Sequence, residues 1–552
     1  MHWKLKSTHQ PKDLVELRKI LLENRQVEDE TNFFAPTHPL ELTLEDVGIS
    51  REQMAKAVAR LEVARDEKQT VVIFGDYDVD GICSTAILWE GLRAFGILAK
   101  PFIPDRLKHG YGLSEKSLAA VLEENKEKFP DLLITVDNGV VAHSAFAELK
   151  RLGIDAILTD HHQPEVDEQG AIKLPDALAV VHTTQLCGST VAWMLARELS
   201  KKSAERSLDL TAIATIADQM PLLEANRSFV KHGLTALQRT HRVGVQLLCA
   251  KANIELKTIT VSGINYGIAP RINAMGRLKH GMDALRLLCT NNIVTADALV
   301  NELMDTNVTR QELTAEMIEH AITQAANWKD QHIIIVSSPE YHEGVVGLIA
   351  GRLVEAYSKP AIVIAEGEDI GKASARSISG VNIIELIREV KDDLLEAGGH
   401  PLAAGFGVSL DKIERVKERL EKLAMDEITE EQLVPSVEIE TLLDRALITL
   451  DTLESLDDFA PFGQLNREPV FGMEGLQIVN VTKIGQEGKH VKFQLQIAQN
   501  PHITFTALAW NKGKLANEFL PGQLVKIAAV LEVNEWKNRR SLQLILKDIQ
   551  AA

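Results

Sequence analysis

The chain has 552 residues, more than a single hydrophobic core usually supports, so we expect several domains. Hydrophobic residues make up 45% and charged residues 25% of the sequence, as in globular proteins, which excludes a largely disordered chain. The formal net charge of −18 counts against a polyanionic partner. Net charge is only a sum, however, and a cleft holding divalent cations can be locally positive on an acidic protein. A nucleic-acid substrate is therefore disfavoured but not excluded.

The amino-terminal region, residues 1–68, is predicted to be a helical leader. The stretches "PKDLVELRKILLENR" and "SREQMAKAVARLEVARDEKQ" each carry an apolar stripe at helical spacing. The first residues have no apolar core of the signal-peptide type, and no apolar run is long enough to cross a bilayer. The sequence thus predicts a cytoplasmic protein with no membrane partner.

Four further regions follow the leader. In residues 69–224, short runs such as "VVIF", "LLITV" and "IDAILT" alternate with amphipathic helices, which indicates a largely parallel α/β sheet. Residues 225–329 are charged and helix-rich, and we interpret them as a bridge to a second α/β unit at 330–430. Residues 435–552 contain five short alternating strands, which favours a small closed barrel of the oligonucleotide-binding (OB) type.

Acids and histidines follow three of the strands predicted in residues 69–224. "GDYDVDG" carries Asp76, Asp78 and Asp80; "DNG" carries Asp137; and "TDHH" carries Asp160, His161 and His162. Each motif by itself is more often an ordinary turn or surface feature. The carboxyl ends of parallel strands share one edge, however, where ligands bind, so the three motifs are expected to converge.

Converging carboxylates must repel one another unless a cation lies among them. Oxygen ligands with an imidazole suit Mn²⁺ or Mg²⁺, and the imidazole favours Mn²⁺. Asp218 ends an apolar helix in "TIADQMPL", where a buried carboxylate is costly unless it is paired or metal-bound. This set can hold two metal ions, an arrangement that fits in-line attack on a phosphorus centre.

These motifs, together with "AGGHPLAAGF", "GIAPRINAMGRL" and "YHEGVVGLIAGRL", resemble the series found in the DHH phosphoesterase superfamily, in particular its RecJ-type single-strand-specific exonucleases. The likeness spans nearly the whole chain in the same order. It implies two α/β domains, DHH and DHHA1, that are joined by a helical bridge and face one another across a cleft, followed by a C-terminal OB barrel.

The resemblance also assigns roles to residues. The implied metal ligands are Asp78, Asp80, Asp137, His161 and Asp218, with Asp137 as the bridge. His162 would contact the scissile phosphate, Asp160 would orient the neighbouring imidazole, and Asp76 would support the site. The implied phosphate-binding residues are Arg106, Ser374, Arg376, Gly399 and His400.

Two more groups are candidates for contacts with a nucleic-acid strand. Arg271 and Arg277, which flank Asn273, are interpreted as contacts to the strand backbone; the alternative is a surface salt bridge. In the barrel, Trp536 with Lys537, Arg539 and Arg540 offers a ring for stacking and charges for phosphate. The alternative there is a β-hairpin with a buried tryptophan.

The resemblance implies a 5′ to 3′ exonuclease that is specific for single-stranded DNA, releases 5′ mononucleotides by a two-metal mechanism, and acts in DNA repair and recombination. A helicase and a single-strand-binding protein are the partners it suggests. One alternative is a phosphodiesterase of the same superfamily for short oligonucleotides or cyclic dinucleotides; another is a non-catalytic replication scaffold. The loop "VVHTTQLCGST", with His182, is shorter than the family pattern, which leaves the path of the strand open there.

Overall fold

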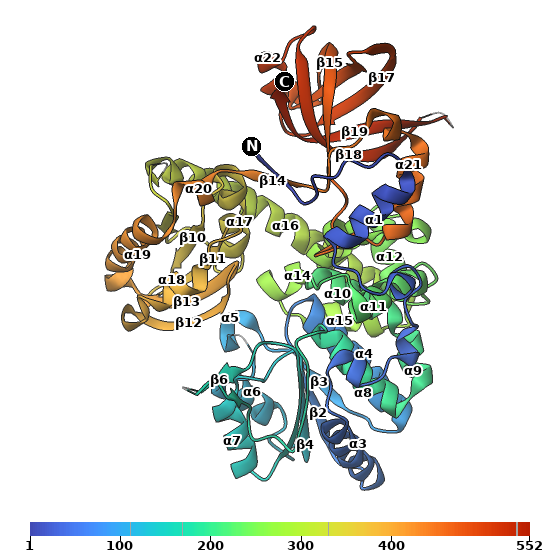
Figure 1. The fold of residues 1–552 in the computed structure, drawn as a ribbon. Coiled ribbons are helices and arrows are strands. Elements are labelled where there is room, and N and C mark those ends of the chain that lie inside the picture. Colours follow the sequence, from blue (N-terminus) through green and yellow to red (C-terminus); the bar gives the residue numbers. More distant parts are fainter. Residues whose placement is uncertain (111, 168, 329, 537–538) are drawn as a thin grey trace. The chain divides into compact units, whose positions relative to one another are not determined.

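The computed structural model describes residues 1–110, 112–167, 169–328, 330–536 and 539–552. Its chain forms two compact units (Figure 1). The parallel-sheet unit comprises residues 31–311 and 461–466, and the barrel unit comprises residues 1–30, 312–460 and 467–552. The structure therefore divides two segments that the sequence predicted as single pieces. The 1–68 leader is split at residue 30, and the 225–329 bridge is split within α16 (Ile293–Ala325).

A five-stranded sheet organises the parallel-sheet unit. Its strands lie in the order β3-β2-β4-β5-β8, and every neighbouring pair is parallel. The central strands are rich in β-branched and leucine residues because helices cover both faces of a parallel sheet. The strands are β2 (Val71–Phe74), β3 (Lys100–Phe102), β4 (Leu132–Val136), β5 (Asp155–Asp160) and β8 (Ala179–His182).

The helices of this unit pack on the sheet and beside it. Close packing is visible between α4 and α8, where a Cβ atom on Gly91 would lie 2.8 Å from Cβ of Ala196. The helices that the site uses are α4 (Val79–Phe95), α5 (Arg106–His109), α8 (Gly188–Leu199), α10 (Leu208–Ala217) and α14 (Ala269–Leu278). Others include α3 (Arg51–Asp66), α6 (Glu115–Glu124), α7 (His143–Arg151), α9 (Lys201–Arg206), α11 (Glu224–Leu237), α12 (Val243–Lys251) and α15 (Met282–Cys289).

The register of the sheet places the polar motifs at one edge. Phe74 pairs with Thr135, and Val136 pairs with Thr159, so β2, β4 and β5 end at nearly the same level. The residues that follow these strands are the acids and histidines of the three motifs. The predicted convergence is therefore built into the strand register.

The barrel unit contains a mixed sheet in the order β12-β13-β11-β10-β9. Its apolar core includes Ile335, Ile364 and Phe406. The strands are β9 (Ile334–Ser338), β10 (Ala361–Glu366), β11 (Ile370–Arg376), β12 (Leu394–His400) and β13 (Ala403–Ser409). The accompanying helices are α17 (Val346–Tyr357), α18 (Ile383–Arg388), α19 (Ile413–Glu427) and α20 (Glu430–Leu433).

A closed five-stranded barrel forms the C-terminal part of the same unit, as predicted. The strands close in the order β15-β16-β17-β19-β18, which is consistent with the OB fold. They are β15 (Phe471–Ile484), β16 (His490–Ile497), β17 (Asn500–Ala509), β18 (Leu524–Trp536) and β19 (Arg539–Ala551). The chain's first residues belong with this part, because β1 (His2–Leu5) pairs in parallel with β14 (Ser436–Ile439).

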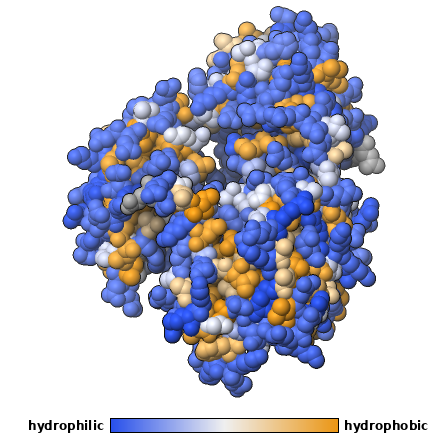
Figure 2. Space-filling view, turned by 60° about the horizontal axis from the view of Figure 1, so that its bottom comes forward, coloured by the Kyte–Doolittle hydropathy of each residue, from blue (hydrophilic) through white to orange (hydrophobic). Residues whose placement is uncertain are grey.

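Hydrophilic residues cover most of the face shown in Figure 2, with hydrophobic residues interspersed, as is usual for a protein surface. Among the described residues, no helix is long and apolar enough to span a membrane.

Candidate metal centre and phosphate-binding residues

The loop between β2 and α4 folds tightly against the start of the helix. A Cβ atom on Gly81 would lie 2.6 Å from the backbone of Asp76, so only glycine permits this approach. Asp78 caps α4 by accepting a hydrogen bond from the Gly81 N–H at 3.0 Å. Asp80 follows in the first turn of the helix. The alternate acids of "GDYDVDG" are thus held by a strand-to-helix turn, as predicted.

The Asp80 carboxylate is held by a second helix, which the sequence reasoning missed. Its two oxygens accept hydrogen bonds from the N–H groups of Gly188 and Ser189, both at 2.7 Å, at the amino-terminal end of α8. Unpaired N–H groups at a helix start favour a negative charge. These two N–H groups belong to the loop "VVHTTQLCGST", which was noted above only as a departure from the family pattern. The small residues "CGST" in this loop are typical of a helix start and could have indicated the contact.

Asp137 adopts a strained backbone conformation directly after β4. Its φ is +60°, in the left-handed region that non-glycine residues seldom occupy. Gly188 lies so close that a Cβ atom there would collide with the Asp137 carboxylate. The strain turns this side chain toward the other acids.

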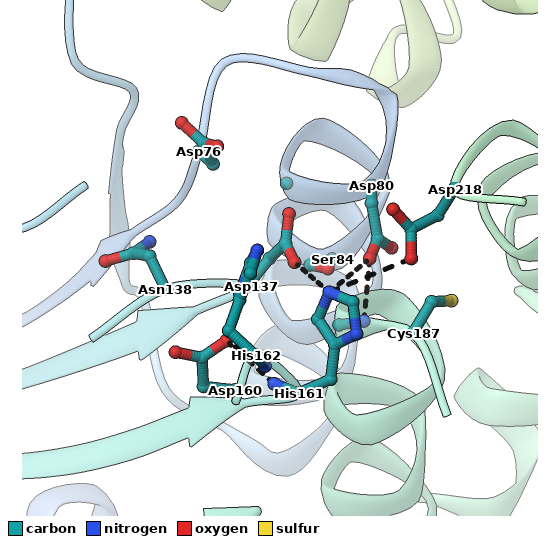
Figure 3. A network of polar contacts seen from close by, with 12 residues as sticks. Asp76, Asp80, Ser84, Asp137, Asn138, Asp160, His161, His162, Cys187 and Asp218 are labelled. Carbon is teal, nitrogen blue, oxygen red and sulfur yellow. Dashed lines mark hydrogen bonds and ion pairs between the residues drawn. The ribbon is translucent and has the colours of Figure 1, made fainter. Parts of the chain in front are cut away.

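The imidazole of His161 lies at the centre of the carboxylates (Figure 3). Its Nε2 atom is 3.2 Å from Asp137 Oδ1, 3.7 Å from Asp80 Oδ2 and 3.8 Å from Asp218 Oδ2. Burial lowers the pKa of His161, which favours a neutral imidazole with a lone pair available. The structure therefore brings together residues from β4, β5, α4 and the end of α10.

A divalent cation fits this arrangement. Asp137 Oδ1 is buried and accepts no hydrogen bond from the residues that the structure describes, although it lies beside His161. A buried carboxylate oxygen without a donor is costly, and a metal ion would satisfy it together with the imidazole. Potential ligand atoms lie within 4.8 Å of one another in three overlapping groups: Asp137 with His161 and His162, Asp80 with His161 and Asp218, and Asp76 with Asp78 and Asp137. Asp137 and His161 each belong to two of these groups. The bridging role of Asp137 stays a prediction.

The electrostatics of the acids support the same interpretation. Burial, followed by the neighbouring carboxylates, raises the pKa of Asp137 and of Asp218 well above the usual range. The pKa of Asp76 and of Asp78 is raised for the same two reasons. The protein alone therefore stabilises these charges poorly, and added cations would restore the ionised state.

The His162 side chain is held separately by Asp160. Asp160 Oδ1 lies 2.7 Å from His162 Nδ1 and also accepts the His161 N–H. Burial by itself would lower the pKa of His162, but the hydrogen bond and charge of Asp160 raise it to about 9. Burial likewise opposes ionisation of Asp160, yet His162 keeps the pKa of that carboxyl low. The Asp160 carboxylate thus favours the protonated imidazole of His162 beside the acids.

The predicted arginines of the parallel-sheet unit have different surroundings. Arg106 lies over the ring of Tyr77, 5.3 Å from its centre, beside the acidic loop. Arg271 donates to the Gly267 carbonyl at 2.6 Å, a contact within the unit rather than a surface ion pair. Contact of either residue with a nucleic-acid strand stays a prediction.

Helix α14 supports the acidic loop directly. Asn273 Oδ1 accepts a hydrogen bond from the Val79 N–H at 3.1 Å. A Cβ atom on Gly276 would collide with the Tyr77 carbonyl, so the helix and the loop are in close contact. Arg277 occupies the last turn of this helix. Asn273 therefore has a structural role at the loop, and strand contacts by Asn273 and Arg277 stay predictions.

Three of the second group of phosphate candidates, Ser374, Arg376 and His400, share one face of the mixed sheet. His400 pairs with Ala403, which pairs in turn with Arg376, so the three form one row across β12, β13 and β11. Two residues along each strand, Ser374 pairs with Gly405 on the same face. Gly399 has a φ of +140°, and a Cβ atom there would lie 2.4 Å from the Ala404 Cα. Phosphate binding by these residues stays a prediction.

The predicted aromatic platform around Trp536 falls partly outside the described residues. Lys537 and the side chain of Trp536 lie outside the described residues. Arg539 begins β19 and is exposed. Arg540 forms ion pairs with Glu454 and Glu535.

Comparison with known families agrees with this architecture. Residues 70–216 match the DHH family, N-terminal domain; residues 330–426 match the DHHA1 domain; and residues 439–548 match the RecJ OB domain. The fold and the site therefore define a metal-dependent phosphoesterase of the DHH and DHHA1 class.

Relatives over most of the chain place it more narrowly. The single-stranded-DNA-specific exonuclease RecJ of Thermus thermophilus is 34% identical over 90% of this chain and 71% of its own length. The RecJ of Haemophilus influenzae is 33% identical over 90% of this chain and 90% of its own length. The RecJ of Bacillus subtilis is 34% identical over 90% of the chain, which spans 63% of that protein. The chain belongs to the RecJ family of single-stranded-DNA-specific exonucleases.

Solved structures of a relative contain the metals that the site is expected to take. The crystal structure of Thermus thermophilus RecJ in complex with Mn²⁺ matches with a TM-score of 0.83 at 30% identity, covering 100% of this chain and 80% of that one. The Mg²⁺ complex matches with a TM-score of 0.77 at 28% identity, covering 100% and 78%.

Proposed function

We propose that the protein hydrolyses single-stranded DNA from the 5′ end and releases 5′ mononucleotides, in DNA repair and recombination. The observation that carries the proposal is the carboxylate cluster around His161, in which Asp137 Oδ1 has no hydrogen-bond donor among the described residues. Relatives named as single-stranded-DNA-specific exonucleases supply the substrate class. The direction and the product rest on the family resemblance.

Five residues would hold two divalent ions, with Mn²⁺ preferred and Mg²⁺ as the alternative. They are Asp78, Asp80, Asp137, His161 and Asp218. When bound, the ions supply positive charge that polarises the scissile phosphate and lowers the pKa of water. The Gly188 and Ser189 N–H groups keep Asp80 in place.

Protein groups would position the phosphate. With its pKa raised to about 9, His162 is an imidazolium at neutral pH and can donate from Nε2 to a phosphate oxygen while Asp160 holds Nδ1. Arg376 and His400 would bind a phosphate of the same strand, since guanidinium and imidazole donors suit phosphate oxygens. Ser374 and the Gly399 backbone would complete that contact.

We also propose that the enzyme acts in the cytoplasm beside a helicase and a single-strand-binding protein. A nuclease restricted to single strands depends on another protein to open a duplex, and exposed single strands in a cell are covered by binding proteins. Copurification of the full chain with either partner would test this part independently of cleavage.

The direct test uses single strands of several lengths, labelled at either end, with Mn²⁺. We expect the 5′ label to leave at once as a mononucleotide while the 3′ label reports progressively shorter strands. Cleavage of di- to tetranucleotides alone would identify the small-substrate phosphodiesterase instead. Binding of strands without cleavage would identify the scaffold.

A further inference from the structure

We propose that residues 461–466, called here the positioning segment, fix the turn that presents Asp218 to the metal ions. Because it assumes that Asp218 is a metal ligand, this inference rests on the proposed function. The segment reads "PFGQLN" and is far from Asp218 in sequence. It is nevertheless a short insertion into the parallel-sheet unit, whose other residues are 31–311. Asp218 and the positioning segment therefore belong to the same compact unit.

The Asp218 carboxylate differs from the Asp80 carboxylate in what holds it. Asp80 accepts hydrogen bonds from the N–H groups of Gly188 and Ser189. Among the described residues, no N–H group donates to the Asp218 carboxylate, which points toward His161 with Oδ2 3.8 Å from Nε2 (Figure 3). The position of the Asp218 side chain therefore depends on the backbone that carries it.

That backbone is a turn between α10 and α11 with an uncommon conformation. Asp218 is the C-cap of α10, and the next residue, Gln219, has a φ of +56°. Glu224, which begins α11, has a φ of +47°. Non-glycine residues keep this left-handed conformation only where the surrounding contacts hold them. Gln219 supplies one such contact, because its Nε2 donates to the Ile216 carbonyl at 2.8 Å.

The positioning segment contacts the second half of this turn. The Leu222 N–H donates a hydrogen bond to the Gln464 carbonyl at 2.8 Å. Leu222 is buried, and a Cβ atom on Gly463 would lie 2.5 Å from Leu222 Cδ1 and 2.9 Å from its Cγ. The segment thus approaches Leu222 closely because residue 463 has no side chain. A displacement of Leu222 would move the same turn that carries Asp218.

The positioning segment is itself a closed loop. Asn466 is fully buried and donates from Nδ2 to the Pro461 carbonyl at 2.9 Å, while the Gly463 N–H donates to the Asn466 carbonyl at 2.9 Å. The buried Arg227 of α11 donates to the Pro461 carbonyl at 3.5 Å and to the Phe33 carbonyl at 2.6 Å. The segment is therefore anchored both to the turn and to the helix that follows it.

A displaced turn should weaken metal binding. Residues that support a metal site must hold its ligands within about 0.5 Å of the required geometry. Loss of such supporting contacts typically lowers metal affinity by about 10- to 100-fold. The positioning segment contacts the turn and supplies no ligand of its own, so its effect on the ions should pass entirely through Asp218.

The test measures Mn²⁺ binding to the full chain without DNA, with free Mn²⁺ followed by electron paramagnetic resonance. Gly463→Ala should raise the Kd of one bound ion by about 10- to 100-fold. Asn466→Ala, which removes the hydrogen bond that closes the loop, should also raise this Kd. In a Leu222→Ala background, Gly463→Ala should cost no further affinity, because the Cγ and Cδ1 atoms that the new methyl group would meet are gone.

Two further variants separate positioning from general destabilisation. Asp218→Asn removes the ligand itself, so adding Gly463→Ala to it should cause no additional loss of Mn²⁺ affinity. Gly244→Ala is the matched control, because a Cβ atom on Gly244 would collide with the Leu287 carbonyl of α15 rather than with the turn. This control should lower the unfolding temperature and keep the wild-type Kd for Mn²⁺.

Each other outcome would overturn the inference. Wild-type Mn²⁺ affinity in either Gly463→Ala or Asn466→Ala would show that the segment only stabilises the fold. An equal loss of affinity in Gly244→Ala would show that any destabilisation suffices. A further loss when Gly463→Ala is added to Asp218→Asn or to Leu222→Ala would show that the segment acts by another route.

Failure of the inference and failure of the proposed function can be distinguished. If the wild-type protein neither binds Mn²⁺ nor cleaves single strands, the proposed function itself fails. If the wild-type protein does both while Gly463→Ala and Asn466→Ala keep its Kd for Mn²⁺, only the role of the positioning segment is wrong.

Discussion

Two groups of buried carboxylates in the parallel-sheet unit are neutralised in different ways. Asp209, 2% exposed, accepts hydrogen bonds from the Thr240 hydroxyl at 2.6 Å and from Arg242 Nε at 3.1 Å. Arg242 also binds both oxygens of Glu90, at 2.7 and 2.8 Å. At the metal centre, by contrast, the acids pair only with histidine: among the described residues, no lysine or arginine forms an ion pair with Asp80, Asp137 or Asp218.

One group of acids is neutralised by an arginine of the protein. The other group requires a cation that is bound from solution. Burial by itself would lower the pKa of Arg242, but Asp209 and Glu90 raise it, so the charges of that group stabilise one another. Around His161, burial and repulsion instead raise the pKa of the acids. A structural ion pair and a metal site can thus be told apart by their partners.

The largest expected effect is loss of turnover in Asp137→Asn. Removing a bridging carboxylate should reduce the stabilisation of the transition state by the metal ions by several kcal/mol, which lowers kcat by roughly 10³-fold. In metal-free buffer the same variant should unfold at a higher temperature than wild type, because one repelling charge is gone. Cleavage assays and thermal unfolding check both. A lower unfolding temperature would show that the carboxylate is structural.

Arg242→Met should have the opposite signature. Leaving the buried Asp209 and the partly exposed Glu90 without their cationic partner should lower the free energy of unfolding by about 3–5 kcal/mol. Arg286→Met is the control, because Arg286 forms a more exposed ion pair with Asp283 and should contribute about 0–1 kcal/mol. Urea unfolding separates the two. Equal effects would contradict the comparison drawn above.

Mn²⁺ should stabilise the wild-type protein against heat. At a concentration of 100 Kd, a ligand that binds only the folded state contributes about 2.7 kcal/mol. The unfolding temperature of Asp137→Asn should respond much less, while that of Arg242→Met should still rise because its metal site is intact. An equal rise in wild type and Asp137→Asn would place the ion elsewhere.

The smallest effect is expected from Asp160→Asn, since Asp160 acts through His162. Loss of a supporting carboxylate typically costs about 10- to 100-fold in activity. The raised pKa of about 9 means that His162 is charged below pH 9; without Asp160 that pKa falls, so the alkaline limb of the pH–rate profile should move to lower pH. Asp155→Asn, at the other end of β5, is the control and should keep the wild-type profile. An unmoved limb in Asp160→Asn would remove His162 as the group responsible.

The sequence by itself determined the parallel sheet, the closed barrel and the gathering of acids with histidines. Short apolar runs have few ways to bury both faces, and parallel strands end at a common edge, so local pattern implied the position of Asp80, Asp137 and His161. The barrel strands could be predicted because apolar and polar residues alternate along them, as in strands with one buried face.

Only the tertiary structure decided which groups complete each site. The N–H groups that hold Asp80 belong to Gly188 and Ser189, more than a hundred residues away, and the small residues that begin α8 do not by themselves show which acid they will contact. The row from His400 to Arg376 depends on strand register, and the division of residues 1–68 depends on the pairing of β1 with β14. Residues that are distant in sequence meet because packing minimises the free energy of the whole chain. The sequence of one short segment does not show which distant residues it will contact.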